Sequence, residues 1–237
     1  HDTIQRQAAE LAAWNRELES RVAQQVAELE RMSALRRFLS PQLVELLVDS
    51  GDQGFLESHR REIVVVFCDL RGFTAFAEVS EPEEVMGVLG DYHRALGQLI
   101  FAFGGTLERF TGDGLMVFFN DPVPCDDGAL KAIRMSMAMR TEVRALAESW
   151  AIQGHDLALG IGIAQGFATL GKIGFEGRFD YAAIGSVTNL AARLCAEAAP
   201  WEIVATGRVV AAAGDGVAGD PQDRRLRGFS RPVRTVS

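Results

Sequence analysis

From Glu62 onward, apolar runs typical of strands alternate with helical stretches, and this alternation limits the fold more than any other feature of the sequence. The run at 63–69 predicts a buried strand, and Ser80 with Pro82 predicts the start of a helix that runs to Gly104. A hairpin is expected over 105–119, with its turn at 111–114. Because a hairpin interrupts the strand–helix alternation, the sequence predicts an α+β sandwich, a mostly antiparallel sheet flanked by helices.

The remainder of this region continues the same pattern. We expect a helix over 127–149, paired strands over 157–170, a strand over 178–184 and a helix over 187–198. The final letters, RTVS, are typical of a last strand, which we expect to continue past the end of this sequence.

Residues 1–39 carry a different pattern, without Pro or Gly. Their apolar residues recur at alternating steps of four and three, which is typical of a coiled-coil seam. The apolar seam positions are Ile4, Ala8, Leu11, Leu18, Val22, Leu29, Met32 and Leu39. The alternative is a solvated amphipathic helix that packs on its own domain, but so long a helix without internal caps favours the intermolecular coiled coil.

The segment at 40–61 is interpreted as a linker with one short helix. Ser40 is a favourable N-cap and Pro41 suits a first helical turn. The domain of interest then covers 62–237. Because the first residue is His1 and lies inside a helical pattern, we expect this chain to be a fragment of a longer protein.

Composition and charge exclude several classes of protein. The 237 residues are 48% hydrophobic and 24% charged, with a net charge of −8, which argues against a nucleic-acid-binding protein because such proteins normally carry a basic face. The three cysteines are far apart and form no CxxC motif, so they signal neither a disulfide framework nor a zinc site. No stretch approaches the roughly 20 apolar residues of a membrane span. We therefore expect a cytoplasmic domain, with any membrane anchor upstream of it.

Two aspartates occupy positions where a metal site is expected. Asp69 ends the first strand, and Asp113 lies in the turn of the hairpin that should pair beside it. Magnesium takes oxygen ligands and is typically held by one or two carboxylates together with substrate phosphates. Gly72 and Thr74 would leave backbone N–H groups free to bind a polyphosphate. Either aspartate alone could be a turn or N-cap residue, whereas the pair favours a metal site.

Four segments carry a resemblance to a known family: VFCDLRGFT, ERFTGDGLMVFF, GIGIAQGFATLGKIG and FDYAAIGSVTNLAARL. In order and spacing they resemble the bacterial class III nucleotidyl (adenylyl and guanylyl) cyclases, over roughly residues 60–237. The resemblance implies a ferredoxin-like catalytic domain. The helical segment that ends in RFLSPQLVELLV resembles the signalling helix and transducing element of such cyclases, which implies an upstream sensor domain in the same full-length chain.

The resemblance also implies a reaction and a set of catalytic residues. It implies a homodimer with shared active sites that converts ATP to 3′,5′-cyclic AMP and pyrophosphate. Asp69, Asp113 and the backbone of Leu70 match the ligands of two Mg²⁺ or Mn²⁺ ions per site. Asn189 and Arg193 match the pair that the other subunit contributes, the Asn to orient the ribose and the Arg to neutralise charge on the α-phosphate. Without the family, the same pair could be a polar stripe on a surface helix.

Further substrate contacts follow from the same resemblance. The phosphate-binding segment is Gly72, Phe73 and Thr74, and Arg227 is the candidate for a phosphate clamp near the last strands. The family's adenylyl members usually carry a Lys where this chain has Arg109.

The position expected to recognise the adenine amino group is Ala182, where the family's adenylyl members usually have Asp or Thr. An alanine side chain can neither donate nor accept a hydrogen bond. The acceptor is therefore missing unless Asp180, on the same strand face, replaces it. ATP is expected as substrate on family grounds, with GTP as the alternative.

Two other functions stay open. A guanylyl cyclase is the nearest alternative, because Arg109 could pair with the N7 and O6 edge of guanine. A non-catalytic, cyclase-like regulatory domain would be expected to have lost a metal aspartate, and both are present here. Diguanylate cyclases share a similar fold but carry a GGDEF-type hairpin, where this chain has TGDGL.

Overall fold

The computed structural model describes residues 14, 17–19, 21, 22, 25, 56–175, 178–214, 217 and 219–237. The chain divides into two compact units, His1–Gly51 and Asp52–Ser237. The described residues of the first unit are helical and exposed. The remaining positions of the predicted coiled coil, and the short helix of the linker, lie outside the described residues.

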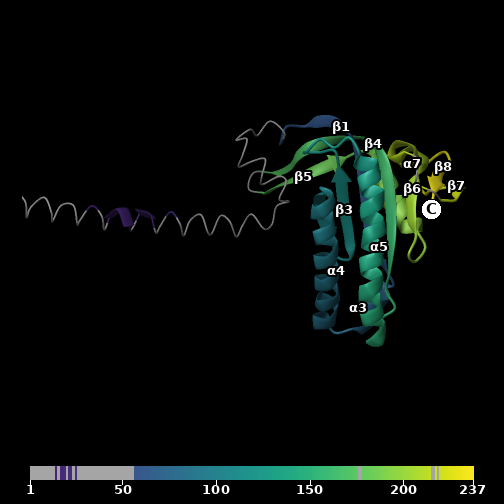
Figure 1. The fold of residues 1–237 in the computed structure, drawn as a ribbon, viewed down its shortest axis with the longest axis horizontal. Helices are drawn as coiled ribbons and strands as arrows, with labels where there is room; N and C mark the ends of the chain where they lie inside the picture. The colour runs from purple at the N-terminus through teal and green to yellow at the C-terminus, as the bar shows by residue number, and fades with distance from the viewer. Residues whose placement is uncertain are drawn as a thin grey trace, which may run out of the picture. The chain divides into compact units, whose positions relative to one another are not determined.

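The second unit is an α+β domain built on one sheet (Figure 1). Within the described residues the sheet has eight strands in the order β2-β3-β1-β4-β6-β8-β7, with β5 paired to β4 off this path. All neighbours are antiparallel except β4 and β6. The strands are β1 (His59–Arg71), β2 (Thr106–Thr111), β3 (Gly114–Phe119), β4 (Ala158–Phe175), β5 (Arg178–Ile184), β6 (Ile203–Thr206), β7 (Pro221–Arg224) and β8 (Val233–Val236).

Helices cover both faces of this sheet. They are α3 (Phe73–Val79), α4 (Pro82–Phe103), α5 (Gly128–Ile152), α6 (Ser186–Glu197) and α7 (Gly207–Ala213). Helices α4 and α5 lie side by side (Figure 1) and share one core with alternate residues of β1, such as Val64 and Val66. The intervening residues, such as Ile63 and Val65, form a second core with α6. In the part of the chain that the structure describes, no helix combines the length and apolar character needed to cross a bilayer.

The paired strands predicted over 157–170 are in fact one long strand, so that prediction was wrong. β4 pairs with the whole of β1, from Arg71 opposite Ala158 to His59 opposite Leu170. Its glycines do not interrupt it. They permit close packing instead, since a Cβ on Gly162 would lie 2.2 Å from the backbone nitrogen of Cys195 in α6.

The start of α4 also differs slightly from the prediction. Ser80 is the C-cap of α3, and α4 begins at Pro82 with Glu81 as its N-cap. The backbone N–H of Glu81 donates to the Glu84 carboxylate at 3.3 Å, which is half of a capping box.

A buried carboxylate fixes the beginning of β1. Asp121 is 1% exposed and accepts hydrogen bonds from His59 Nε2 (2.8 Å) and from the Tyr181 hydroxyl, while Arg61 Nη1 lies 3.3 Å from its Oδ2. His59 Nδ1 donates to the carbonyl of Glu57 at 2.9 Å. These two hydrogen bonds raise the pKa of His59 above its usual 6.5, because an imidazolium can donate from both nitrogens.

His59→Gln is therefore expected to destabilise the domain more at pH 5.5 than at pH 8.5. A pKa raised in the folded state gives stability that is complete below the unfolded pKa near 6.5 and is lost as the pH rises through the folded pKa. Urea midpoints of both chains at the two pH values would measure this. An equal loss of stability at both pH values would show that His59 is neutral in the folded protein.

Candidate metal and nucleotide site

Asp69 and Asp113 meet at one end of the central strands. Asp69 lies in β1 opposite Gly160, and Asp113 lies in the turn between β2 and β3. Because the β1–β3 pairing reaches Cys68 opposite Leu115, the turn passes beside Asp69. A hydrogen bond joins the two carboxyl groups. The structure thus brings together the two aspartates that the sequence singled out.

The electrostatics of this pair suit a cation. The pKa of Asp113 is raised to about 6, with burial as the largest cause, followed by the hydrogen bond with Asp69 and the negative charge of Asp69, while the backbone N–H groups of Asp113 and Leu70 act in the opposite direction. When both carboxyl groups are ionised, two negative charges lie close together, and added positive charge stabilises them. A divalent cation supplies that charge, and their oxygens are the donors that Mg²⁺ and Mn²⁺ prefer.

The protein alone supplies few ligands here. Within the described residues, no group of three or more His, Cys, Asp or Glu side chains is placed to hold a metal ion. The backbone of Leu70 borders the pair, since its N–H faces Asp113. An ion bound by two carboxylates would complete its coordination with a backbone carbonyl, water or substrate oxygens, as is usual for magnesium.

The predicted phosphate-binding segment follows Asp69 directly. Gly72 has a φ of 86°, and a Cβ on it would lie 2.6 Å from the carbonyl oxygen of Asp156, so only glycine fits. Phe73 and Thr74 begin α3. The N–H groups of a first helical turn have no partner within the helix, so those of Phe73 and Thr74 are free for another acceptor.

The predicted base-reading residues gather around β2 and β5. A bulge in β2 lies between Leu107 and Arg109, next to Glu108. Arg109 Nη2 donates to Glu108 Oε1 at 2.8 Å, and this hydrogen bond and the charge of Glu108, together with the charge of Asp180, raise the pKa of Arg109. Ala182 is buried, two residues along the strand from Asp180 and therefore on the same strand face.

The other predicted residues lie elsewhere. Asn189 and Arg193 are exposed, one turn apart on α6. Arg227 is exposed in the connection between β7 and β8, at the opposite edge of the sheet from β2. No hydrogen bond or ion pair among the described residues joins these three to Asp69 or Asp113. One chain therefore holds the two carboxylates and displays the α6 pair without a hydrogen bond or ion pair between the two sets in the part of the chain that the structure describes.

Sequence reasoning missed two residues that support the carboxylates. Arg71 Nη1 donates to Asp69 Oδ2 at 2.9 Å. His93, on α4, donates from Nε2 to the carbonyl of Gly112 at 3.0 Å and thereby supports the turn that carries Asp113. The only available signal for Arg71 was its position two residues after Asp69, and a strand places such residues on the same face.

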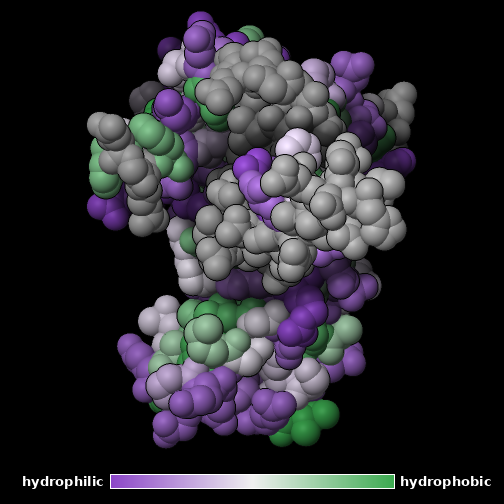
Figure 2. Space-filling view, turned by 90° about the vertical axis from the view of Figure 1, so that its left-hand side faces the viewer, coloured by the Kyte–Doolittle hydropathy of each residue, from purple (hydrophilic) through white to green (hydrophobic). Residues whose placement is uncertain are grey.

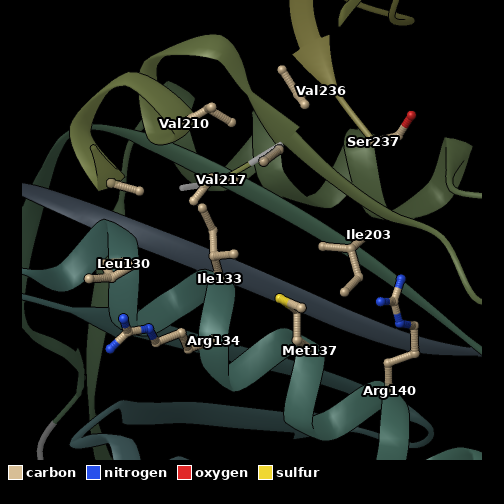
Figure 3. Close-up of a pocket in the computed structure, with 12 residues that line it drawn as sticks. Leu130, Ile133, Arg134, Met137, Arg140, Ile203, Val210, Val217, Val236 and Ser237 are labelled. Atoms are coloured by element: carbon tan, nitrogen blue, oxygen red, sulfur yellow. The ribbon is translucent and has the colours of Figure 1, made fainter. Parts of the chain in front are cut away.

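A cavity of about 580 Å³ lies away from all these residues, between α5, α7, β6 and β8 (Figure 3). Its lining is mostly apolar and includes Ile133 and Met137 of α5 and Ile203 of β6, with Arg140 at its side. None of the predicted site residues lines it. The candidate site is therefore separate from this pocket and lies at a sheet end.

Comparison with known proteins identifies similar sequences. Residues 56–221 match the family model described as the adenylate and guanylate cyclase catalytic domain. The chain is 29% identical over 177 residues to adenylate cyclase 1 of Rhizobium meliloti, which covers 73% of this chain and 27% of that protein. It is 27% identical over 166 residues to an adenylate cyclase of Anabaena cylindrica, covering 69% of this chain and 33% of that protein. The chain thus spans about a quarter to a third of the length of these relatives.

Solved structures agree with these matches. The adenylyl cyclase CyaB from P. aeruginosa superposes with a TM-score of 0.73 at 34% identity, covering 76% of this chain and 94% of that one. The guanylyl cyclase Cya2 superposes equally well, with a TM-score of 0.73 at 33% identity, covering 76% of this chain and 92% of that one. A bacterial light-regulated adenylyl cyclase shares the fold, with a TM-score of 0.78 at 21% identity, over 91% of this chain and 62% of that one.

Proposed function

Because this chain belongs to the adenylate and guanylate cyclase catalytic-domain family, we propose that it converts ATP to 3′,5′-cyclic AMP and pyrophosphate. The observation that carries this proposal is the carboxyl pair of Asp69 and Asp113, hydrogen-bonded to each other at one end of the central strands. A domain that had lost catalysis would have no need to keep two adjacent carboxyl groups that repel each other when both are ionised. The non-catalytic alternative is therefore disfavoured.

In the proposed reaction Asp69, Asp113 and the carbonyl of Leu70 would hold two Mg²⁺ or Mn²⁺ ions. When bound, the ions supply positive charge that lowers the pKa of the ribose 3′-hydroxyl and balances the triphosphate. The backbone N–H groups of Phe73 and Thr74, after the turn at Gly72, bind phosphate oxygens. The 3′-hydroxyl gives its proton to water and its oxygen bonds to the α-phosphorus, while the bond from that phosphorus to the pyrophosphate oxygen breaks and pyrophosphate leaves.

We further propose that a second copy of the chain completes each site. In a head-to-tail pair, Asn189 of one copy would orient the ribose bound to the other, and Arg193 would stabilise charge on the α-phosphate. Their exposure on α6, apart from the carboxylates, is consistent with such sharing. Arg227 keeps the role of a phosphate clamp in this proposal.

Exposed apolar residues support pairing of chains. Several lie on the β4–β5 hairpin: Phe167, Ile173, Phe175, Phe179 and Ile184 are all more than 40% exposed. In Figure 2, hydrophobic residues lie among hydrophilic ones in the lower half of the view, at the level of α4 in Figure 1. Apolar side chains gathered on one hairpin are typical of an interface that another chain covers.

The nucleotide is the least constrained part of the proposal. ATP is favoured because the first two relatives are named adenylate cyclases. A guanylyl cyclase is the second candidate, since Cya2 is as similar as CyaB and Arg109 can donate to two acceptors of guanine. With this function we propose regulation through the 1–39 coiled coil and the 40–61 linker by an upstream sensor, and a cytoplasmic location for the 62–237 domain.

The direct test is product analysis. The purified chain is incubated with ATP or GTP and with Mg²⁺ or Mn²⁺, and the products are separated by chromatography and identified by mass spectrometry. Cyclic AMP and pyrophosphate are expected, and none should form with a chelator present. Cyclic GMP alone would establish the second candidate, and the absence of both cyclic nucleotides would refute the proposal.

Ala182→Asp is expected to raise the ratio of kcat/KM for ATP to that for GTP by about tenfold or more, because a carboxylate accepts from the adenine amino group and repels guanine O6. Asp180→Asn, which keeps the side chain's size, should lower the same ratio if Asp180 already serves as the acceptor. A ratio unchanged in both active variants would mean that neither side chain reads the base.

A further inference from the structure

Arg71 joins two parts of the domain that are far apart in the sequence. It is the last residue of β1, and its side chain is 21% exposed. Its Nη1 donates to Asp69 Oδ2 at 2.9 Å, its Nε donates to the carbonyl of Ala198 at 3.0 Å, and its Nη2 donates to the carbonyl of Cys195. One guanidinium therefore binds a site carboxylate and two backbone carbonyls.

The two carbonyls lie at the end of α6. Cys195 is in its last turn, and Ala198 is its C-cap. The Cys195 carbonyl also accepts from the backbone N–H of Ala198 at 3.1 Å. Carbonyls at a helix C-terminus carry partial negative charge, so a cation is favourable there. The planar guanidinium can reach both carbonyls and the carboxylate at once, which a lysine ammonium on its flexible stem cannot reproduce in the same geometry.

Two glycines of β4 provide the space for this arrangement. Gly160 lies opposite Asp69 across the β1–β4 ladder, and a Cβ on it would come within 2.6–2.9 Å of the Arg71 guanidinium. A Cβ on Gly162 would come within 2.2–2.3 Å of the α6 backbone. Because Gly160 and Gly162 have no side chains, Arg71 and α6 can pack directly against the backbone of β4.

We propose that Arg71 is a positioning residue that holds the Asp69 carboxylate as a metal ligand and ties it to α6, the helix that carries Asn189 and Arg193. This inference rests on the proposed function. In a head-to-tail pair, Asp69 serves one site and α6 of the same chain serves the other. Arg71 therefore connects two parts of its own chain: the carboxylate that binds metal in one site, and the helix that enters the other site of the dimer.

Two variants test this without removing a charge. Arg71→Lys keeps the positive charge but loses the forked, planar guanidinium. Gly160→Ala displaces the Arg71 guanidinium while removing no charged side chain. Arg94→Lys is the control, because Arg94 pairs with Asp91 on the surface of α4 at 2.7 Å. Circular dichroism and melting temperature show whether each variant folds, so either of the first two can carry the test.

The first readout needs no turnover. Mn²⁺ binding to the full chain is followed by the electron paramagnetic resonance signal of the free ion, without nucleotide. We expect Arg71→Lys and Gly160→Ala to raise the Kd for Mn²⁺ about tenfold or more, as is typical for loss of a residue that orients a metal ligand, and Arg94→Lys to leave it unchanged. An unchanged Kd in both folded variants would overturn the proposal. A wild-type chain that binds Mn²⁺ but forms no cyclic nucleotide would refute the proposed function and leave this test intact.

The second readout separates the two ends of the link. In a mixed dimer of an Asp113→Ala chain with an Asn189→Ala chain, only one shared site is complete, and both chains keep the Arg71–Asp69 pair. Arg71→Lys is placed on one chain at a time. A fall in kcat in both placements supports the link to α6, because the chain with Asp113→Ala can act on the complete site only through that helix. A fall only on the chain that supplies both carboxylates of the complete site would overturn the link.

Discussion

Asp69→Ala and Asp113→Ala are each expected to lower kcat for cyclic nucleotide formation by about a thousandfold or more. Each substitution removes a carboxylate that we propose as a metal ligand. Bound metal stabilises transition-state charge by several kcal/mol, and every 1.4 kcal/mol changes the rate tenfold. Rates at saturating ATP and Mg²⁺ measure the loss.

The fold should survive both substitutions. The Asp69 side chain is 39% exposed, and Asp113 lies in a turn, so neither change empties a core position. Asp91→Ala is the matched control, since Asp91 is a surface carboxylate in an ion pair with Arg94, and its activity should equal that of the wild type. Mg²⁺ should raise the melting temperature of the wild type and of Asp91→Ala but not of the two site variants. Activity near the wild-type level in either site variant would contradict the metal assignment.

The positions of these two aspartates could be predicted because their signals are local. The apolar run that ends at Asp69 marks a buried strand, and the Gly-containing turn around Asp113 marks a hairpin beside it. The structure joins the two carboxyl groups by a hydrogen bond. The long helices were predicted for the same reason, because α4 and α5 each repeat their pattern over several turns.

The features that were not predicted depend on contacts distant in the sequence or on short elements. Arg71 binds carbonyls 124 and 127 residues away, and nothing near it in the sequence marks that partnership. The single long β4 was interpreted as paired strands because its glycines weaken the strand pattern. Gly162 is required by the close approach of α6, a tertiary contact that the local sequence does not reveal. Elements such as α3, β6, β7 and α7 have four to seven residues, too few for a periodic pattern.

Mixing an inactive Asp69→Ala chain with an inactive Asn189→Ala chain is expected to restore activity that neither has alone. In a head-to-tail dimer, each active site takes its carboxylates from one copy and its α6 pair from the other. The mixed dimer then contains one site with both defects and one with none. With random pairing, half of the dimers are mixed, so the expected activity is about a quarter of the wild-type value.

The matched control is a mixture of Asp69→Ala with Asp113→Ala. Both substitutions damage the carboxylate half, so every site in every possible dimer carries a defect and no activity should return. Exchange of subunits in both mixtures is verified by energy transfer between differently labelled chains. If chains exchange and the Asp69→Ala mixture with Asn189→Ala stays inactive, each site must be formed within one chain. That outcome is difficult to reconcile with the exposed positions of Asn189 and Arg193 on α6, where no contact among the described residues joins them to the carboxylates. Restoration in the first mixture alone therefore distinguishes shared sites from any arrangement in which one chain is sufficient.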